Sequence, residues 1–107
     1  MGKTAEADAA MKQALPKGKV NEVHQYARGL LRQKKSKEAF EIFKMNYDKN
    51  PNEFTALVGM TRGYSAIGDY KKAIEFAQLA LPKAPDSANK TAIGGMIDKL
   101  KEGKDVN

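Results

Sequence analysis

A 34-residue echo constrains the fold of this chain more than any other feature of its sequence. The stretch 36–51, SKEAFEIFKMNYDKNP, is followed by a related stretch at 70–85, YKKAIEFAQLALPKAP. Displacing the sequence by 34 positions superposes identical residues at several places, among them Arg28 on Arg62, Gly29 on Gly63, Ala39 on Ala73 and Pro51 on Pro85. A fixed period of about 20 to 50 residues indicates stacked supersecondary units. The chain is therefore expected to be a repeat array.

The composition is that of one ordinary globular domain. The chain has 107 residues, of which 41% are hydrophobic and 30% charged, as expected for a single domain without disorder. No apolar run approaches the roughly 18 residues of a spanning helix, and no signal peptide is recognisable, so no membrane insertion is expected. The absence of cysteine excludes disulfides and thiolate chemistry. None of this indicates a cellular compartment.

The first 19 residues resemble only the second half of a repeat. Residues 1–7 align with 67–73, and the sequence ALPK at 14–17 recurs at 80–83. Apolar residues within 5–15 recur at spacings of three and four, which predicts an amphipathic helix. Its partner helix is missing, so we expect either a fragment of a longer protein or a homodimer through residues 5–15.

Five further helices are predicted from apolar spacing and from turn residues. They span about 20–33, 37–49, 53–67, 69–81 and 87–100. The side chains expected to cap helix starts are Ser36, Asn52, Asp69, and either Asp86 or Ser87. Gly68 and Gly103 are expected to end helices.

The last predicted helix departs from the repeat. It keeps the register at first, because Ala27, Thr61 and Gly95 are spaced by 34 residues, and loses it by Asp98. The polar sequence after Leu100 suits a capping helix, which needs a polar outer face. Two adjacent glycines inside a helix each cost about 1 kcal/mol relative to alanine, so Gly94-Gly95 is expected to mark close helix packing. An unrelated four- or five-helix bundle is the alternative fold.

The repeated residues resemble the tetratricopeptide repeat. The motif of the first unit is Val23-x2-Tyr26-Ala27-x2-Leu30, Ala39-x3-Phe43 and Pro51, and that of the second is Leu57-x2-Met60-Thr61-x2-Tyr64, Ala73-x3-Ala77-x2-Ala80 and Pro85. Neither unit opens with the tryptophan of the family motif. The chain also resembles the C-terminal repeat region of longer bacterial proteins. The resemblance implies an all-α, right-handed solenoid of antiparallel helix pairs: a half repeat (1–19), two full repeats (20–53 and 54–87) and a capping helix (88–103).

The resemblance also implies a concave groove lined by the first helix of each unit. The principal candidate residues for binding a partner are Asn21, His24, Gln25, Arg28, Arg32, Thr55, Arg62 and Asn89. Further groove positions are Leu31, Val58, Gly59, Ser65, Ala66, Ala92, Ile93 and Met96. Arg28 and Arg62 are equivalent positions, and arginine forms a fork suited to carboxylates. An acidic protein segment is therefore the expected ligand; alternatively, the arginines are solvated or pair with Glu22, Glu53 or Asp98.

No residue set for catalysis or for a metal is present. The chain has one histidine and no cysteine, which is too few for a nucleophile paired with a base or for a usual zinc site. We therefore expect a non-enzymatic protein without cofactor or small-molecule substrate. The net charge of +6 and the basic run at 32–37 raise nucleic-acid binding as a less favoured alternative. The function classes that remain are a protein-interaction scaffold and a structural appendage that positions another domain.

Overall fold

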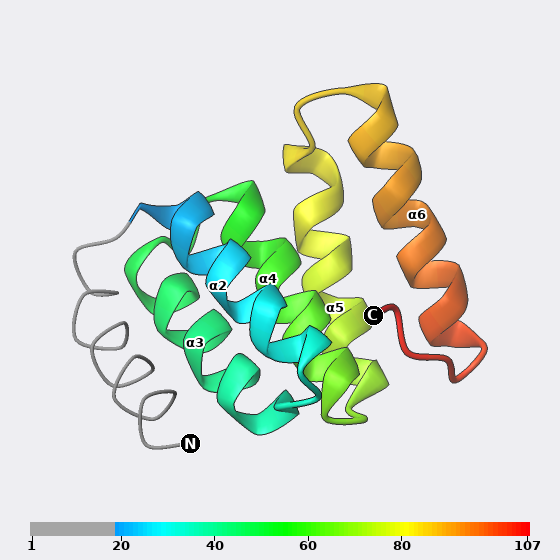
Figure 1. The fold of residues 1–107 in the computed structure, drawn as a ribbon. Coiled ribbons are helices and arrows are strands. Elements are labelled where there is room, and N and C mark those ends of the chain that lie inside the picture. Colours follow the sequence, from blue (N-terminus) through cyan, green and yellow to red (C-terminus); the bar gives the residue numbers. More distant parts are fainter. Residues whose placement is uncertain (1–18) are drawn as a thin grey trace, which may run out of the picture.

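The computed structural model describes residues 19–107, and every regular element within this range is helical. The elements are α2 (Val20–Arg32), α3 (Ser36–Lys49), α4 (Phe54–Ala66), α5 (Tyr70–Ala80), the 3₁₀ turn η2 (Leu81–Lys83) and α6 (Ser87–Lys101) (Figure 1). The predicted all-α class is confirmed for this range, and each helix lies within two residues of its predicted bounds. The proposed half repeat and the proposed homodimer contact at 5–15 lie outside the described residues.

Consecutive helices run antiparallel and pack side by side (Figure 1). In addition, α2 contacts α4, the helix that follows two places later. The starts of α2 and α4, Val20 and Phe54, are 34 residues apart, as are the starts of α3 and α5, Ser36 and Tyr70. The sequence period is therefore also the period of the helix starts.

Three of the helices end in the same reversal of the chain. After α2, α4 and α6, one residue adopts a left-handed conformation: Lys34 at φ 62°, Gly68 at φ 86° and Gly103 at φ 76°. At each site the two backbone N–H groups beyond the helix bond back to carbonyls of its last turn, for example Gly103 N to Leu100 O at 3.0 Å and Lys104 N to Lys99 O at 2.9 Å. This is the Schellman arrangement, which satisfies carbonyls that the helix leaves free.

Two of the four predicted helix caps are correct. The Asp69 carboxylate accepts from Lys72 N at 3.2 Å, and that of Asp86 accepts from Asn89 N at 2.8 Å. The prediction for Ser36 is wrong, because the reversal at Lys34 brings the chain into α3 one residue early. Ser36 is therefore already helical, and Lys35 occupies the cap position without a side-chain bond. Asn52 likewise lies one residue too early, since α4 is preceded by Glu53.

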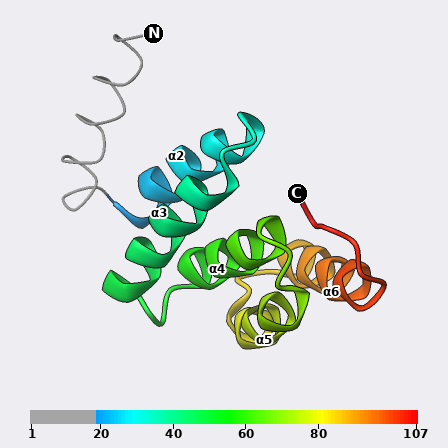
Figure 2. The same cartoon turned by 90° about the horizontal axis from the view of Figure 1, so that it is seen from below.

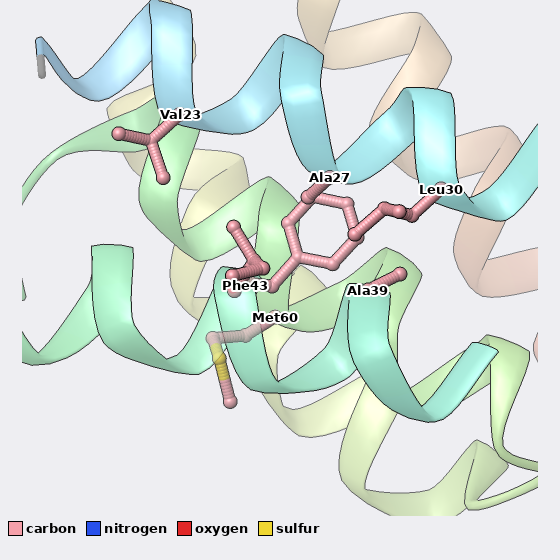
Figure 3. Packing of buried hydrophobic residues seen from close by; sticks show 7 residues of the cluster. Val23, Ala27, Leu30, Ala39, Phe43 and Met60 are labelled. Carbon is pink, nitrogen blue, oxygen red and sulfur yellow. The ribbon is translucent and has the colours of Figure 1, made fainter. Parts of the chain in front are cut away.

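The core is continuous through α4. One cluster joins α2, α3 and α4 around Phe43, which is fully buried and lies among Val23, Ala27, Leu30 and Met60 (Figure 3). A second cluster joins α4, α5 and α6. Members of the second cluster are Leu57, Val58, Ala77, Ala80, Ile93 and Ile97. Because α4 contributes to both clusters, it is buried on more than one face.

The close helix approach occurs at a different pair of glycines from the predicted one. A Cβ atom on Gly94 or Gly95 would meet no atom within 4 Å, so the prediction of tight packing there is wrong. A Cβ on Gly59 would lie 2.7 Å from Phe43 Cδ1, and one on Gly63 would lie 3.2 Å from Phe40 Cδ2. The glycines that matter for packing are therefore Gly59 and Gly63 of α4, because the lack of a side chain at these positions lets α3 lie close to α4.

Candidate functional site

Two neighbouring hollows lie on the side of α4 that faces α2. The first, the helix hollow, has a volume of about 220 Å³ and is bounded by α2, α4 and the start of α6. The second, the tail hollow, has a volume of about 390 Å³ and is bounded by α2, α4 and the segment Lys104–Asn107, here called the tail. Arg28 and Arg62 line both hollows. We refer to the two hollows together as the groove.

The structure brings all eight principal candidate residues to this groove. Seven of them line the helix hollow: Asn21, His24, Gln25, Arg28, Thr55, Arg62 and Asn89. Arg32 lines the tail hollow together with Leu31. Two of the further groove positions are wrong, since Gly59 is buried against Phe43 and Ile93 belongs to the core cluster of α4, α5 and α6. The role of the eight residues in binding stays a prediction.

Equivalent positions of the two helix pairs touch directly in the groove. Thr55 is displaced by 34 residues from Asn21, and its hydroxyl donates to Asn21 Oδ1 at 3.1 Å. Asn89, a further 34 residues on, lines the same hollow from α6. The 34-residue spacing thus places Asn21, Thr55 and Asn89 in one row of polar side chains, contributed by α2, α4 and α6.

The two groove arginines lie in each other's electrostatic field. Burial is the main cause that lowers the pKa of Arg62, the nearby positive charge of Arg28 lowers it further, and the carboxylate of Asp105 opposes the shift. The Nε atom of Arg62 is buried without a hydrogen-bond partner. An arginine nevertheless stays protonated in a protein. The groove therefore concentrates positive charge where water is partly excluded, a setting in which a carboxylate interacts strongly.

Among the residues it describes, the structure does not show the ion pairs that the sequence offered as an alternative role for Arg28 and Arg62. Within residues 19–107, no ion pair joins Arg28 or Arg62 to Glu22, Glu53 or Asp98. The ion pairs that the structure shows there, such as Lys44–Asp48 at 3.3 Å, are formed by exposed side chains that line neither hollow. The carboxylate that acts on Arg62 is that of Asp105, which the sequence analysis did not single out.

His24 forms the wall between the groove and the core. Only 7% of its surface is exposed, and its ring lies 5.4 Å from that of Phe43. The Nδ1 atom is buried without a hydrogen-bond partner. Burial, followed by the charges of Arg62 and Arg28, lowers the pKa of His24 to about 4. His24 is thus a neutral residue at pH 7 that lines the groove, as expected, while most of its surface is buried against the core.

The tail occupies one end of the groove through bonds to α4. The Ser65 hydroxyl donates to the Asp105 carboxylate and accepts from Val106 N at 2.9 Å. The Asn107 amide donates to the Arg62 carbonyl at 2.9 Å, and Arg62 Nη1 donates to Asn107 Oδ1 at 3.4 Å. Figure 2 shows the tail leaving α6 and ending on the same side of α4 as α2. The polar sequence of the tail has no periodicity, and only Gly103 indicated that the chain turns back.

The rest of the described surface offers weaker candidates. The basic turn at 34–38 borders a shallow hollow of about 330 Å³. The four tyrosines and four phenylalanines all lie within the described range and are buried or half-buried, so few rings are free to stack on bases. No group of three side chains suited to a metal occurs among residues 19–107. Over the same residues, no helix combines the length and apolarity that crossing a membrane requires.

Comparison with known proteins adds no further constraint. No protein-family model matches the chain, and neither the curated proteins nor the solved structures provide a match. The functional conclusion therefore depends on the groove itself.

Proposed function

We propose that this chain is a tetratricopeptide-like, non-enzymatic interaction module that binds an acidic segment of a partner protein in its groove. The convergence of Arg28 and Arg62 on two adjoining hollows is the observation that carries the proposal. Paired arginines recognise carboxylates by charge-assisted hydrogen bonds that are stronger than neutral ones. The row formed by Asn21, Thr55 and Asn89 supplies polar groups for the backbone of an extended ligand.

The 34-residue spacing of the helix starts supports the solenoid part of the proposal. In such an array, the first helix of each pair contributes the inner wall of a groove. The contact between α2 and α4 agrees with this arrangement. The preference for a protein ligand over nucleic acid is supported by the absence of exposed aromatic rings in the described range.

Selection of peptides from a random library tests the proposal. Peptides of about ten residues are selected on the wild-type protein and on Arg28→Ala/Arg62→Ala. We expect Asp- and Glu-containing peptides to be enriched on the wild type and lost on the double variant. The matched control, Lys71→Ala/Lys101→Ala, removes two positive charges from exposed positions outside the groove and should keep the enrichment.

Two results would overturn the proposal. One is the absence of any acidic enrichment on the wild type, which would favour a purely structural appendage. The other is an equal loss on both double variants, because the attraction would then depend on net charge and not on the groove. Circular dichroism spectra and urea midpoints equal to those of the wild type show that the variants are folded.

A further inference from the structure

The tail carries the chemistry that the groove is proposed to recognise. Its side chains present one carboxylate, from Asp105, and one carboxamide, from Asn107, on either side of Val106. Val106 and Asn107 line the tail hollow beside Arg28, Leu31 and Arg62. A short segment of this chain thus lies where an acidic segment of a partner is expected to lie.

The path of the chain directs the tail to this position. The Schellman reversal at Gly103 fixes the exit from α6 through two backbone hydrogen bonds. The tail then makes four hydrogen bonds with Arg62 and Ser65 of α4. Ser65 is 1% exposed, and its hydroxyl contacts both a side chain and a backbone N–H of the tail. The contact therefore joins a buried hydroxyl of α4 to a largely exposed segment without regular secondary structure.

We propose that the tail is a built-in occupant of the groove, which a partner displaces with a segment carrying an Asp-x-Asn pattern or its equivalent. This inference rests on the proposed function; it adds the pattern of residues that the ligand carries and the control of ligand binding by the tail. The carboxylate of the ligand takes the place of Asp105 on the Ser65 hydroxyl, and the following backbone N–H takes that of Val106. The carboxamide of the ligand bonds Arg62 as Asn107 does.

The side chain of Arg28 can give a partner segment a contact that the tail does not make, which would allow the partner to displace the tail. Arg28 lines both hollows, but within residues 19–107 its side chain forms no hydrogen bond or ion pair. The side chains of the tail offer a single carboxylate, that of Asp105, which bonds Ser65. A partner with a second acidic residue can therefore pair with Arg28 as well. The tail has the advantage of being tethered, which corresponds to an effective concentration on the order of millimolar.

The docking itself is tested by nuclear magnetic resonance on the full chain. The variant Asp105→Ala/Asn107→Ala removes three of the four tail bonds, and Glu102→Ala is the control. Glu102 is also an exposed carboxylate near the end of α6, but it bonds Lys104 and not α4. We expect large shifts of the amides of residues 62–66 in the double variant and small ones in the control. Equal spectra of residues 62–66 in all three proteins would overturn the inference.

Competition is tested with a synthetic peptide of the tail sequence, GKDVN, titrated into the same proteins; the peptide is acetylated at its N-terminus and amidated at its C-terminus, so that the aspartate supplies its only carboxylate. A tail bound in about 70–90% of molecules weakens the apparent affinity by about 3- to 10-fold, because only the open fraction binds. The peptide is therefore expected to bind the double variant about 3- to 10-fold more tightly than the wild type or Glu102→Ala. A peptide with asparagine in place of aspartate, GKNVN, should bind none of them.

The variant Ser65→Ala, combined with the two tail changes, locates the site. Removal of the hydroxyl deletes the group that holds the carboxylate, so binding of GKDVN should be lost. Equal affinity of GKDVN for the wild type and the double variant would overturn the tail inference, while the proposed function would stand on its own peptide selection. The proposed function would be overturned by a different result: the resonance spectra show that the tail docks, but neither GKDVN nor any library peptide binds the protein.

Discussion

Replacing Gly59 by alanine tests the claim that α4 and α3 are held together at glycine contacts. The new Cβ would lie 2.7 Å from Phe43 Cδ1 and 3.3 Å from His24 Nδ1. The Phe43 ring is fully buried and surrounded by residues of three helices, so it has no free space into which to move. The backbone of α4 must therefore shift away from α3.

The expected change in stability is a balance of two effects. Alanine in place of glycine in a helix stabilises by about 0.5–1 kcal/mol. Overpacking of a well-packed core costs about 1–3 kcal/mol, so Gly59→Ala should lower the free energy of unfolding by about 0.5–2 kcal/mol. At Gly95 an added Cβ would meet no atom within 4 Å. Only the helix effect then applies, and Gly95→Ala should stabilise by about 0.5–1 kcal/mol.

Urea unfolding followed by circular dichroism measures both variants. The midpoints should move in opposite directions with unchanged slope, which identifies the changes as changes in stability. Gly63→Ala provides an intermediate case, because its Cβ would lie 3.2 Å from Phe40 Cδ2. The reasoning is refuted if Gly59→Ala is as stable as the wild type, or if Gly95→Ala is the more damaging change.

Two further predictions concern backbone strain and pH. Lys34→Gly should stabilise the protein by about 1 kcal/mol in urea unfolding, because Lys34 has φ 62° and glycine adopts this conformation without strain; an unchanged or lower midpoint would contradict this. The pKa of His24 is lowered to about 4 in the folded protein against about 6.5 in an unfolded chain. Stability should therefore fall with pH below about 6.5, by about 2 kcal/mol between pH 7 and pH 5. His24→Gln should lose most of this dependence, and an equal slope in that variant would contradict the assignment.

Apolar spacing and turn residues predicted the helices, and the repeat period, together with the family resemblance, predicted the principal residues that line the groove. Displacement by 34 residues places Arg62 after Arg28 and Thr55 after Asn21, and these residues meet at the same hollows. A repeat period carries one geometry from unit to unit, so many positions that face the groove in one unit do so in the next, although Gln25 lines the groove and its equivalent Gly59 is buried against Phe43. That is why a sequence that matches no protein family still indicated which side chains share a surface.

Helix starts and glycine packing were not predictable from the same pattern. Ser36 follows a reversal at Lys34, a residue that rarely adopts a left-handed conformation, so no local signal marked the earlier start of α3. Gly94 and Gly95 looked like packing glycines because they are adjacent, whereas the structure places the contacts at Gly59 and Gly63. Close approach depends on which large ring lies opposite, and the ring of Phe43 belongs to another helix.

The burial of Arg62 links the folding of this domain to its proposed ligand. Burial and the charge of Arg28 both oppose the charged state of Arg62 in the folded protein, and Asp105 offsets part of this. Folding thus places two positive charges together at a cost that a further carboxylate in the groove would reduce. A ligand that binds the folded state stabilises it to an extent that grows with its concentration relative to Kd. The two arginines that we propose to attract an acidic segment therefore oppose each other's charge in the free domain, and the carboxylate of Asp105 in the tail offsets part of this.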